Sequence, residues 1–230
     1  MKIKGFLTTS FSDWDGKVSS VIFLPRCNFR CPMCHNHQLV SNPDSLPTVR
    51  KNDVVKWLTA KRDFIDGVVV TGGEPTVHKD LEDLLKELKD LGFDVKLDTN
   101  GSHPLILEYL IEQELVDYIA MDIKAPLDPQ KYSELAGVKV DIRKIGQSIG
   151  VIMSFGIDYE FRTTVPPTLT KQDVFNIARE IEGAKKYVLQ RFIPDNALSP
   201  EYRKLKPYTE AQLKEMAEIC RLVLKNVKVR

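Results

Sequence analysis

Cysteine is scarce in this chain of 230 residues, which has only four. We therefore do not expect a framework of disulfides. Apolar residues make up 43% of the chain, yet no apolar run approaches the ~20 residues needed to span a bilayer. Residues 1–16 also lack the apolar stretch of a signal peptide. These absences predict a globular, soluble protein of the cytoplasm.

An excess of one charge sign is missing as well. The formal net charge is +1, and no strongly basic segment stands out, so nucleic-acid binding is not indicated. There is no internal repeat, low-complexity tract or Gly/Ser-rich linker. The length suits one sizeable core, and we expect a single domain.

Short apolar runs rich in β-branched residues alternate with amphipathic helical patterns. Strands are predicted at 20–24, 67–71, 93–99, 118–124, 159–165 and 187–193. Helices are predicted at 51–64, 79–91, 104–115, 141–154, 170–182 and 209–225. This alternation indicates an α/β fold with parallel strands, either a doubly wound open sheet or a barrel.

Three of the four cysteines stand close together. Cys27, Cys31 and Cys34 directly follow the apolar stretch SVIFL, at the end of a predicted strand where α/β active sites collect. Cys220 lies in the last helical pattern, where we expect it to be buried for packing. A zinc site with His35 or His37 as fourth ligand is one interpretation. The other is an iron–sulfur cluster with one iron left open to a ligand.

The motif CxxxCxxC after the first strand resembles that of radical SAM enzymes. The resemblance implies a single-domain partial (β/α)6 TIM-like barrel. On this interpretation residues 1–18 are an N-terminal extension, 19–193 form the barrel, and 194–230 form a C-terminal loop and helix. Cys27, Cys31 and Cys34 would bind a 4Fe-4S cluster whose fourth iron is chelated by S-adenosylmethionine. One electron would then cleave S-adenosylmethionine to methionine and a 5'-deoxyadenosyl radical that abstracts a hydrogen atom.

The second predicted strand ends in TGGEP, and its Gly72, Gly73 and Glu74 are similar to the GGE motif of the same family. Two glycines allow a ligand to approach the backbone closely, and a carboxylate accepts hydrogen bonds from an ammonium group. The resemblance assigns these residues to the amino group of S-adenosylmethionine.

The stretches LDTNG, MDIKAP and FRTTVPP, with the CHN ending of the cysteine motif, resemble glycyl-radical-enzyme activases. Strand alternation places charged residues of these stretches on shared faces, which predicts a polar cavity. The resemblance implies that the S-adenosylmethionine site includes Asn36, Asp98, Thr99, Asp122, Lys124 and Arg162. It also suggests a monovalent cation near Asp98, Thr99 and Asp122.

The first 170 residues or so resemble activating proteins of anaerobic ribonucleoside-triphosphate reductase. Met33 stands where that family usually has an aromatic residue near the adenine. The sequence assigns no role to Gln190 and Arg191. Segment 192–207 is interpreted as a polar connection, with a lid as the alternative.

The preferred hypothesis is therefore an oxidoreductase that activates a glycyl radical enzyme, with a flavodoxin or ferredoxin-type protein as reductant. A radical SAM enzyme acting on a small molecule, such as a 7-carboxy-7-deazaguanine synthase, is the alternative within the class. A zinc-stabilised binding module is the alternative from another class. Iron and sulfide analysis separates these classes, because a zinc protein is colourless.

Overall fold

One curved eight-stranded sheet forms the centre of the protein in the computed structural model, which describes residues 1–230. Its strands follow each other in chain order, and only the first pair is antiparallel. They are β1 (Gly5–Ser10), β2 (Ser19–Leu24), β3 (Gly67–Gly72), β4 (Asp94–Thr99), β5 (Tyr118–Asp122), β6 (Asp158–Val165), β7 (Tyr187–Arg191) and β8 (Val227–Val229). The edge strands β1 and β8 do not pair with each other, so the barrel is open.

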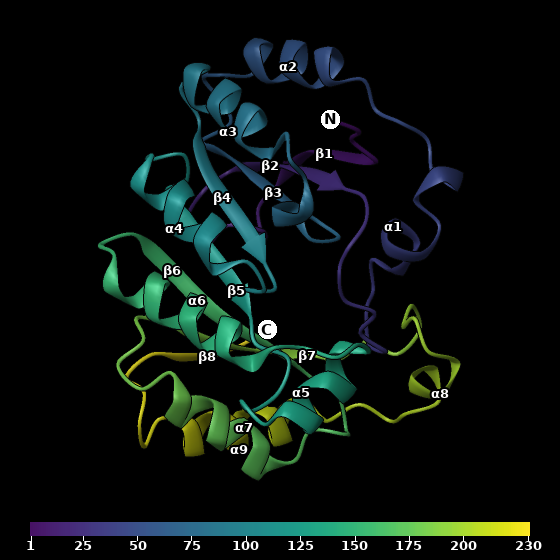
Figure 1. The fold of residues 1–230 in the computed structure, drawn as a ribbon, viewed down its shortest axis with the longest axis vertical. Coiled ribbons are helices and arrows are strands. Elements are labelled where there is room, and N and C mark those ends of the chain that lie inside the picture. Colours follow the sequence, from purple (N-terminus) through teal and green to yellow (C-terminus); the bar gives the residue numbers. More distant parts are fainter.

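Helices cover the outer face of this sheet (Figure 1). The covering helices are α2 (Lys51–Ala60), α3 (Leu81–Asp90), α4 (Pro104–Glu112), α6 (Ile142–Ser154), α7 (Lys171–Glu180) and α9 (Glu210–Cys220). Three shorter helices belong to the loops: α1 (His37–Ser41), α5 (Pro129–Ala136) and α8 (Pro200–Arg203). Single 3-10 turns occur at Pro43–Ser45 and Pro75–Val77. No helix is long and apolar enough to cross a bilayer.

The prediction of a single α/β domain with an open barrel is confirmed, and the six predicted strands correspond to β2 through β7. Two edge strands and the short helices α1, α5 and α8 were not predicted. Strand β8 has only three residues, and β1 is defined by its antiparallel pairing with β2. Helix α5 has only eight residues, which is too short for a clear periodic pattern. Its ends do carry recognisable signals, because Asp128 caps its first turn and Gly137 ends it in the left-handed conformation.

The loop between β1 and β2 lies against the inner face of the sheet. Trp14 is buried there with Val21 and Val69, and its ring lies 5.7 Å from that of Tyr118. On the far side of the barrel, Asp15 makes ion pairs with three cations: Lys186 Nζ at 2.8 Å, Lys228 Nζ at 3.2 Å and Arg230 Nη2 at 2.7 Å. The loop therefore connects β2 to the opposite edge of the open sheet.

We expect the Asp15→Asn substitution to lower the free energy of unfolding at pH 7 by about 1 kcal/mol, since the site is partly screened by solvent. The hydrogen bond from Lys186 and the charges of Arg230 and Lys228 outweigh partial burial and hold the pKa of Asp15 below its usual value. A carboxylate with a lowered pKa stabilises the fold above its unfolded pKa of about 3.9 and loses that effect as the pH falls.

Urea unfolding of the two proteins between pH 7 and pH 3 tests this expectation. The difference between them should shrink below about pH 4. Asp44→Asn is the matched control, because the Asp44 carboxylate is exposed and lies 3.9 Å from its one partner, Lys2. An equal loss of stability in both variants would contradict a specific role for the Asp15 ion pairs.

Candidate active site

A cavity of about 440 Å³ opens at the carboxyl ends of the parallel strands. We call it the central cavity. Every site residue predicted from the sequence lines it: Cys27, Cys31, Cys34, Asn36, Gly72, Gly73, Glu74, Asp98, Thr99, Asp122, Lys124 and Arg162. They come from the loop after β2 and from the ends of β3 to β6. Parallel strands bring their carboxyl ends to one edge of a sheet, which explains why distant motifs meet here.

The cysteine loop is held by backbone hydrogen bonds to three distant segments. Arg26 N donates to Leu39 O at 2.7 Å, Arg30 N donates to Ala136 O at 2.8 Å, and Ser199 N donates to Pro32 O at 3.0 Å. Arg26, just before the first cysteine, adopts a left-handed conformation with φ of 66°. The loop conformation is therefore determined by contacts with α1, the end of α5 and the segment before α8.

Burial governs the protonation of the three thiols. It raises the pKa of Cys27 to about 11 and that of Cys31 to about 12, while Lys124 acts weakly in the opposite direction on Cys31. The pKa of Cys34 is raised for the same reason. The free thiols are therefore protonated at neutral pH, and binding of a metal releases protons.

The arrangement of these cysteines fits a cluster better than a single ion. No group of three or more His, Cys, Asp or Glu side chains in the chain converges on one metal ion. A cluster instead takes each thiolate on a different iron atom. His35 Nε2, a possible zinc ligand, contacts Ile193 O at 2.6 Å. Cys220 is fully buried in α9 and lies outside the cavity.

Neighbouring donors already point at one of these sulfurs. Phe29 N donates to Cys27 Sγ at 3.3 Å, and Asn100 Nδ2 lies 3.7 Å from the same atom. Hydrogen bonds of this kind tune the reduction potential of clusters. The residues present thus fit the iron–sulfur cluster that the sequence motif implies.

Gly72 and Gly73 let the end of β3 pass against the start of the cysteine loop. Gly72 has φ of 123°, and a Cβ added there would lie 2.3 Å from Leu24 O. A Cβ on Gly73 would lie 1.7 Å from Arg26 O. The close approach permits two backbone hydrogen bonds of 2.8 Å, from Gly73 N to Leu24 O and from Glu74 N to Arg26 O. Both glycines are therefore required by the backbone itself.

The Glu74 side chain is almost fully buried, and protein donors surround its carboxylate. Oε1 accepts hydrogen bonds from Thr76 N at 3.1 Å, Thr76 Oγ1 at 2.5 Å and Thr99 Oγ1 at 2.8 Å. Oε2 accepts one from Asn100 N at 2.6 Å. Burial still raises the pKa of this carboxyl above its ordinary value. Glu74 thus fastens the loop after β3 to the end of β4.

Two carboxylates and two cations face each other across the central cavity. Arg162 Nε donates to Asp122 Oδ1 at 2.8 Å, and Arg162 Nη1 lies 3.3 Å from Asp98 Oδ2. Lys124 Nζ donates to Asp122 Oδ2 at 3.1 Å. Burial opposes ionisation of Asp122, but the charges of Arg162 and Lys124 prevail and hold its pKa at about 2. These ion pairs favour the charged forms of Asp122, Lys124 and Arg162.

One oxygen of this group has no hydrogen-bond partner. Asp98 Oδ1 is buried, and Lys96 Nζ lies 3.9 Å away, beyond hydrogen-bond distance. A buried polar atom without a partner is costly, so it marks a place for a donor from a bound molecule. An ammonium or hydroxyl group of S-adenosylmethionine would supply such a donor.

The cavity lining also includes residues outside the predicted set of site residues. Gln190 and buried Met33 line the cavity, whereas Arg191 is exposed and does not. Asp13 and Phe23 line it too, although no motif marked them. The period-two alternation of β2 could have identified Phe23, but the Asp13 loop gave no signal.

Segment 192–207 packs against the cysteine loop. Phe192 is buried and stacks on His35 with 6.4 Å between ring centres, and Tyr202 packs edge-on against Phe192. Through these contacts the start of segment 192–207 packs next to His35, the residue that follows Cys34.

Comparison with known proteins agrees with this geometry. The family described as the Radical SAM superfamily matches residues 21–181. A protein of Methanocaldococcus jannaschii, named as a candidate glycyl-radical enzyme activating enzyme, is 35% identical over 99% of this chain and 95% of its own length. A second protein of that organism with the same description is 28% identical over 88% of this chain and 80% of its own length.

Among solved structures, SuiB of Streptococcus suis bound to S-adenosylmethionine superposes with a TM-score of 0.67 at 16% identity. The match covers 91% of this chain, which spans about half of SuiB. It shows a shared fold. Membership of this family argues against the alternative interpretation of a zinc-stabilised binding module. The chain belongs to the radical SAM superfamily, and its cofactors are those of that family, a 4Fe-4S cluster and S-adenosylmethionine.

Proposed function

We propose that this protein is an oxidoreductase that activates a glycyl radical enzyme by removing a hydrogen atom from a glycine α-carbon. The observation that carries this proposal is the 35% identity to the M. jannaschii protein, which extends over nearly the full length of both chains. Similarity to GTP 3',8-cyclases is confined to about half of this chain. The open barrel, whose edge strands remain unpaired, suits a polypeptide substrate.

Within this proposal Cys27, Cys31 and Cys34 hold the cluster. When bound, the cluster supplies the electron for reductive cleavage of S-adenosylmethionine, and the hydrogen atom taken from glycine ends in 5'-deoxyadenosine. A flavodoxin or ferredoxin-type protein would deliver that electron. Cys31 is buried, Cys27 and Cys34 are half-buried, and the N–H donors at Cys27 would hydrogen-bond its thiolate.

The remaining cavity residues bind and orient S-adenosylmethionine. Asp98 offers the unpartnered oxygen, and Asn36 Nδ2 donates to Gly72 O at 3.2 Å, which fixes the cysteine loop beside the end of β3. Because its carboxylate is already occupied, we assign Glu74 a positioning role and give the amino-group contact to Gly72 and Gly73. The other residues that we propose to bind S-adenosylmethionine are Thr99, Asp122, Lys124 and Arg162. A monovalent cation is proposed near Asp98, Thr99 and Asp122.

A deuterium-transfer experiment tests the proposed function. The enzyme is reconstituted anaerobically and reduced, and then mixed with a glycyl radical enzyme that was labelled with α-deuterated glycine. We expect deuterium in the 5'-deoxyadenosine and an EPR signal of a glycyl radical on the partner. Deuterium-free 5'-deoxyadenosine without a partner radical would overturn the proposal and favour a small-molecule substrate.

A further inference from the structure

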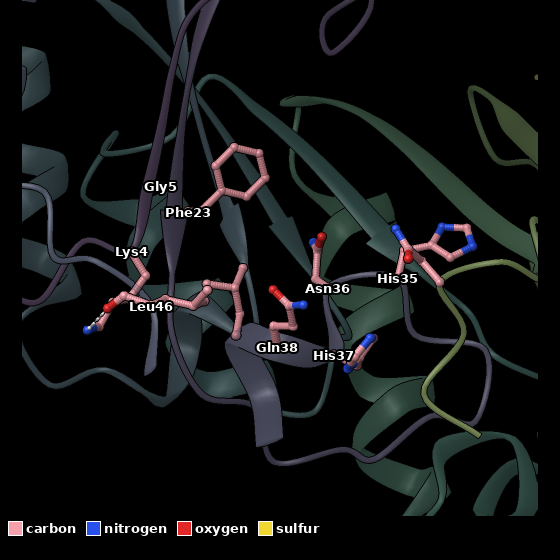
Figure 2. A pocket seen from close by; sticks show the side chains of 10 residues that line it. Lys4, Gly5, Phe23, His35, Asn36, His37, Gln38 and Leu46 are labelled. Carbon is pink, nitrogen blue, oxygen red and sulfur yellow. Dashed lines mark hydrogen bonds between the residues drawn. The ribbon is translucent and has the colours of Figure 1, made fainter. Parts of the chain in front are cut away.

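A second pocket, of about 240 Å³, adjoins the central cavity. We call it the side pocket. Phe23, His35 and Asn36 line both spaces, so the two spaces lie next to each other. In Figure 2, Asn36 and Gln38 lie in the middle of the side pocket, with Lys4 and Leu46 on one side and His35 on the other. The side pocket, at about 240 Å³, is smaller than the central cavity, at about 440 Å³, and is large enough for one side chain.

The lining of the side pocket is largely polar and includes one cationic side chain, that of Lys4. It contains Lys4, two histidines and the amides of Asn36, Gln38 and Asn196, and no aspartate or glutamate. Amide and imidazole groups donate hydrogen bonds to an anion as readily as a hydroxyl does. The lining therefore favours a negatively charged occupant.

Lys4 makes this preference specific. The residue is only 9% exposed, and the partners of its ammonium are neutral oxygens, Leu46 O at 2.9 Å and Thr48 Oγ1 at 2.9 Å. Buried lysines are normally paired with a carboxylate, because an unpaired buried charge is costly. An ammonium has three donors, so one is left after these two hydrogen bonds. A bound anion would supply the missing counter-charge.

We propose that the side pocket binds a carboxylate of the hydrogen-donor substrate, namely an acidic side chain close in sequence to the reacting glycine. This inference rests on the proposed function, because a polypeptide substrate is what links an acid in the side pocket to a glycine in the central cavity. The pocket thereby selects and orients the substrate segment without touching the reacting atoms.

Isothermal titration calorimetry of the reconstituted enzyme with S-adenosylmethionine tests this proposal. The probes are short alanine-rich peptides with a central glycine, carrying either aspartate or isosteric asparagine at a series of distances from it. We expect the best aspartate peptide to bind about tenfold more tightly than its asparagine counterpart, since hydrogen bonds to ionised groups are the stronger ones.

Three variants identify the pocket. Lys4→Met removes the ammonium and keeps the apolar stem, and Gln38→Glu adds a negative charge at an exposed position of the lining. Both should lose the preference for aspartate. Lys2→Met, at an exposed lysine outside the pocket, should retain it. If wild-type enzyme binds no peptide at millimolar concentration, or binds both kinds equally, the proposal fails.

The outcomes also separate this inference from the proposed function. Equal binding of the two kinds of peptide, together with deuterium transfer from a glycyl radical enzyme, would overturn the carboxylate site alone. Acetate or succinate that binds with the same dependence on Lys4, while the peptides do not, would assign the pocket to a small acid and overturn the peptide carboxylate.

Discussion

Replacing Cys31 with alanine is expected to abolish cluster binding and, with it, cleavage of S-adenosylmethionine. Cys31 is the most buried of the three loop cysteines and lines the central cavity. A cluster already held by only three protein ligands would keep two. Neighbouring segments fix the loop by hydrogen bonds at Arg30 and Pro32, so we expect it to stay in place without supplying a replacement ligand. Iron and sulfide analysis after anaerobic reconstitution measures the first effect, and assay of 5'-deoxyadenosine measures the second.

Cys220→Ala is the matched control for this experiment. Cys220 is buried like Cys31, and more deeply, but its Sγ lies 3.8 Å from Val174 O, between α9 and α7. We expect full iron and sulfide content in this variant, with a loss of about 1 kcal/mol in the free energy of unfolding. Full cluster content in Cys31→Ala would show that the cysteine loop does not hold the cluster.

The sequence predicted those strands whose local apolar pattern matches their place in the parallel sheet. Each of the strands β2 to β7 is a short apolar run before a helix, and this pattern is sufficient for a parallel strand. Strand β8 has no such local signal, because three residues form it through pairing with β7. The role of Trp14 beneath the sheet depends on a loop that crosses the barrel, and a linear pattern cannot show that crossing.

The candidate site was accessible from the sequence for a related reason. Strand-end motifs are local, and parallel pairing alone brings them together around the central cavity. The sequence could not show which hydrogen bonds connect these strand ends to one another. Glu74 has the right chemistry for a ligand contact, and its carboxylate also accepts hydrogen bonds from Thr76, Thr99 and Asn100 that connect the loop after β3 to β4. Lys4 lies far from every motif, and only its burial without a carboxylate draws attention to it.

Replacing Gly73 with alanine should damage the site through the backbone. The added Cβ would lie 1.7 Å from Arg26 O, a contact with main chain that no rotamer change can relieve. Arg26 already has a left-handed conformation and directly precedes Cys27, so a displaced carbonyl moves the first cluster ligand. The hydrogen bond from Glu74 N to Arg26 O would also be lost. We expect a loss of about 3 kcal/mol in the free energy of unfolding.

Gly150→Ala is the control that isolates this contact. Gly150 is exposed within α6, and a Cβ there would meet nothing within 4 Å, so alanine should stabilise the helix by up to about 1 kcal/mol. Urea unfolding of the metal-free proteins compares the two variants, and iron content after reconstitution reports on the cysteine loop. We expect reduced iron content in Gly73→Ala alone. Wild-type stability and cluster content in Gly73→Ala would mean that β3 and the cysteine loop can separate without consequence, and the glycine pair would then act only through the bound cofactor.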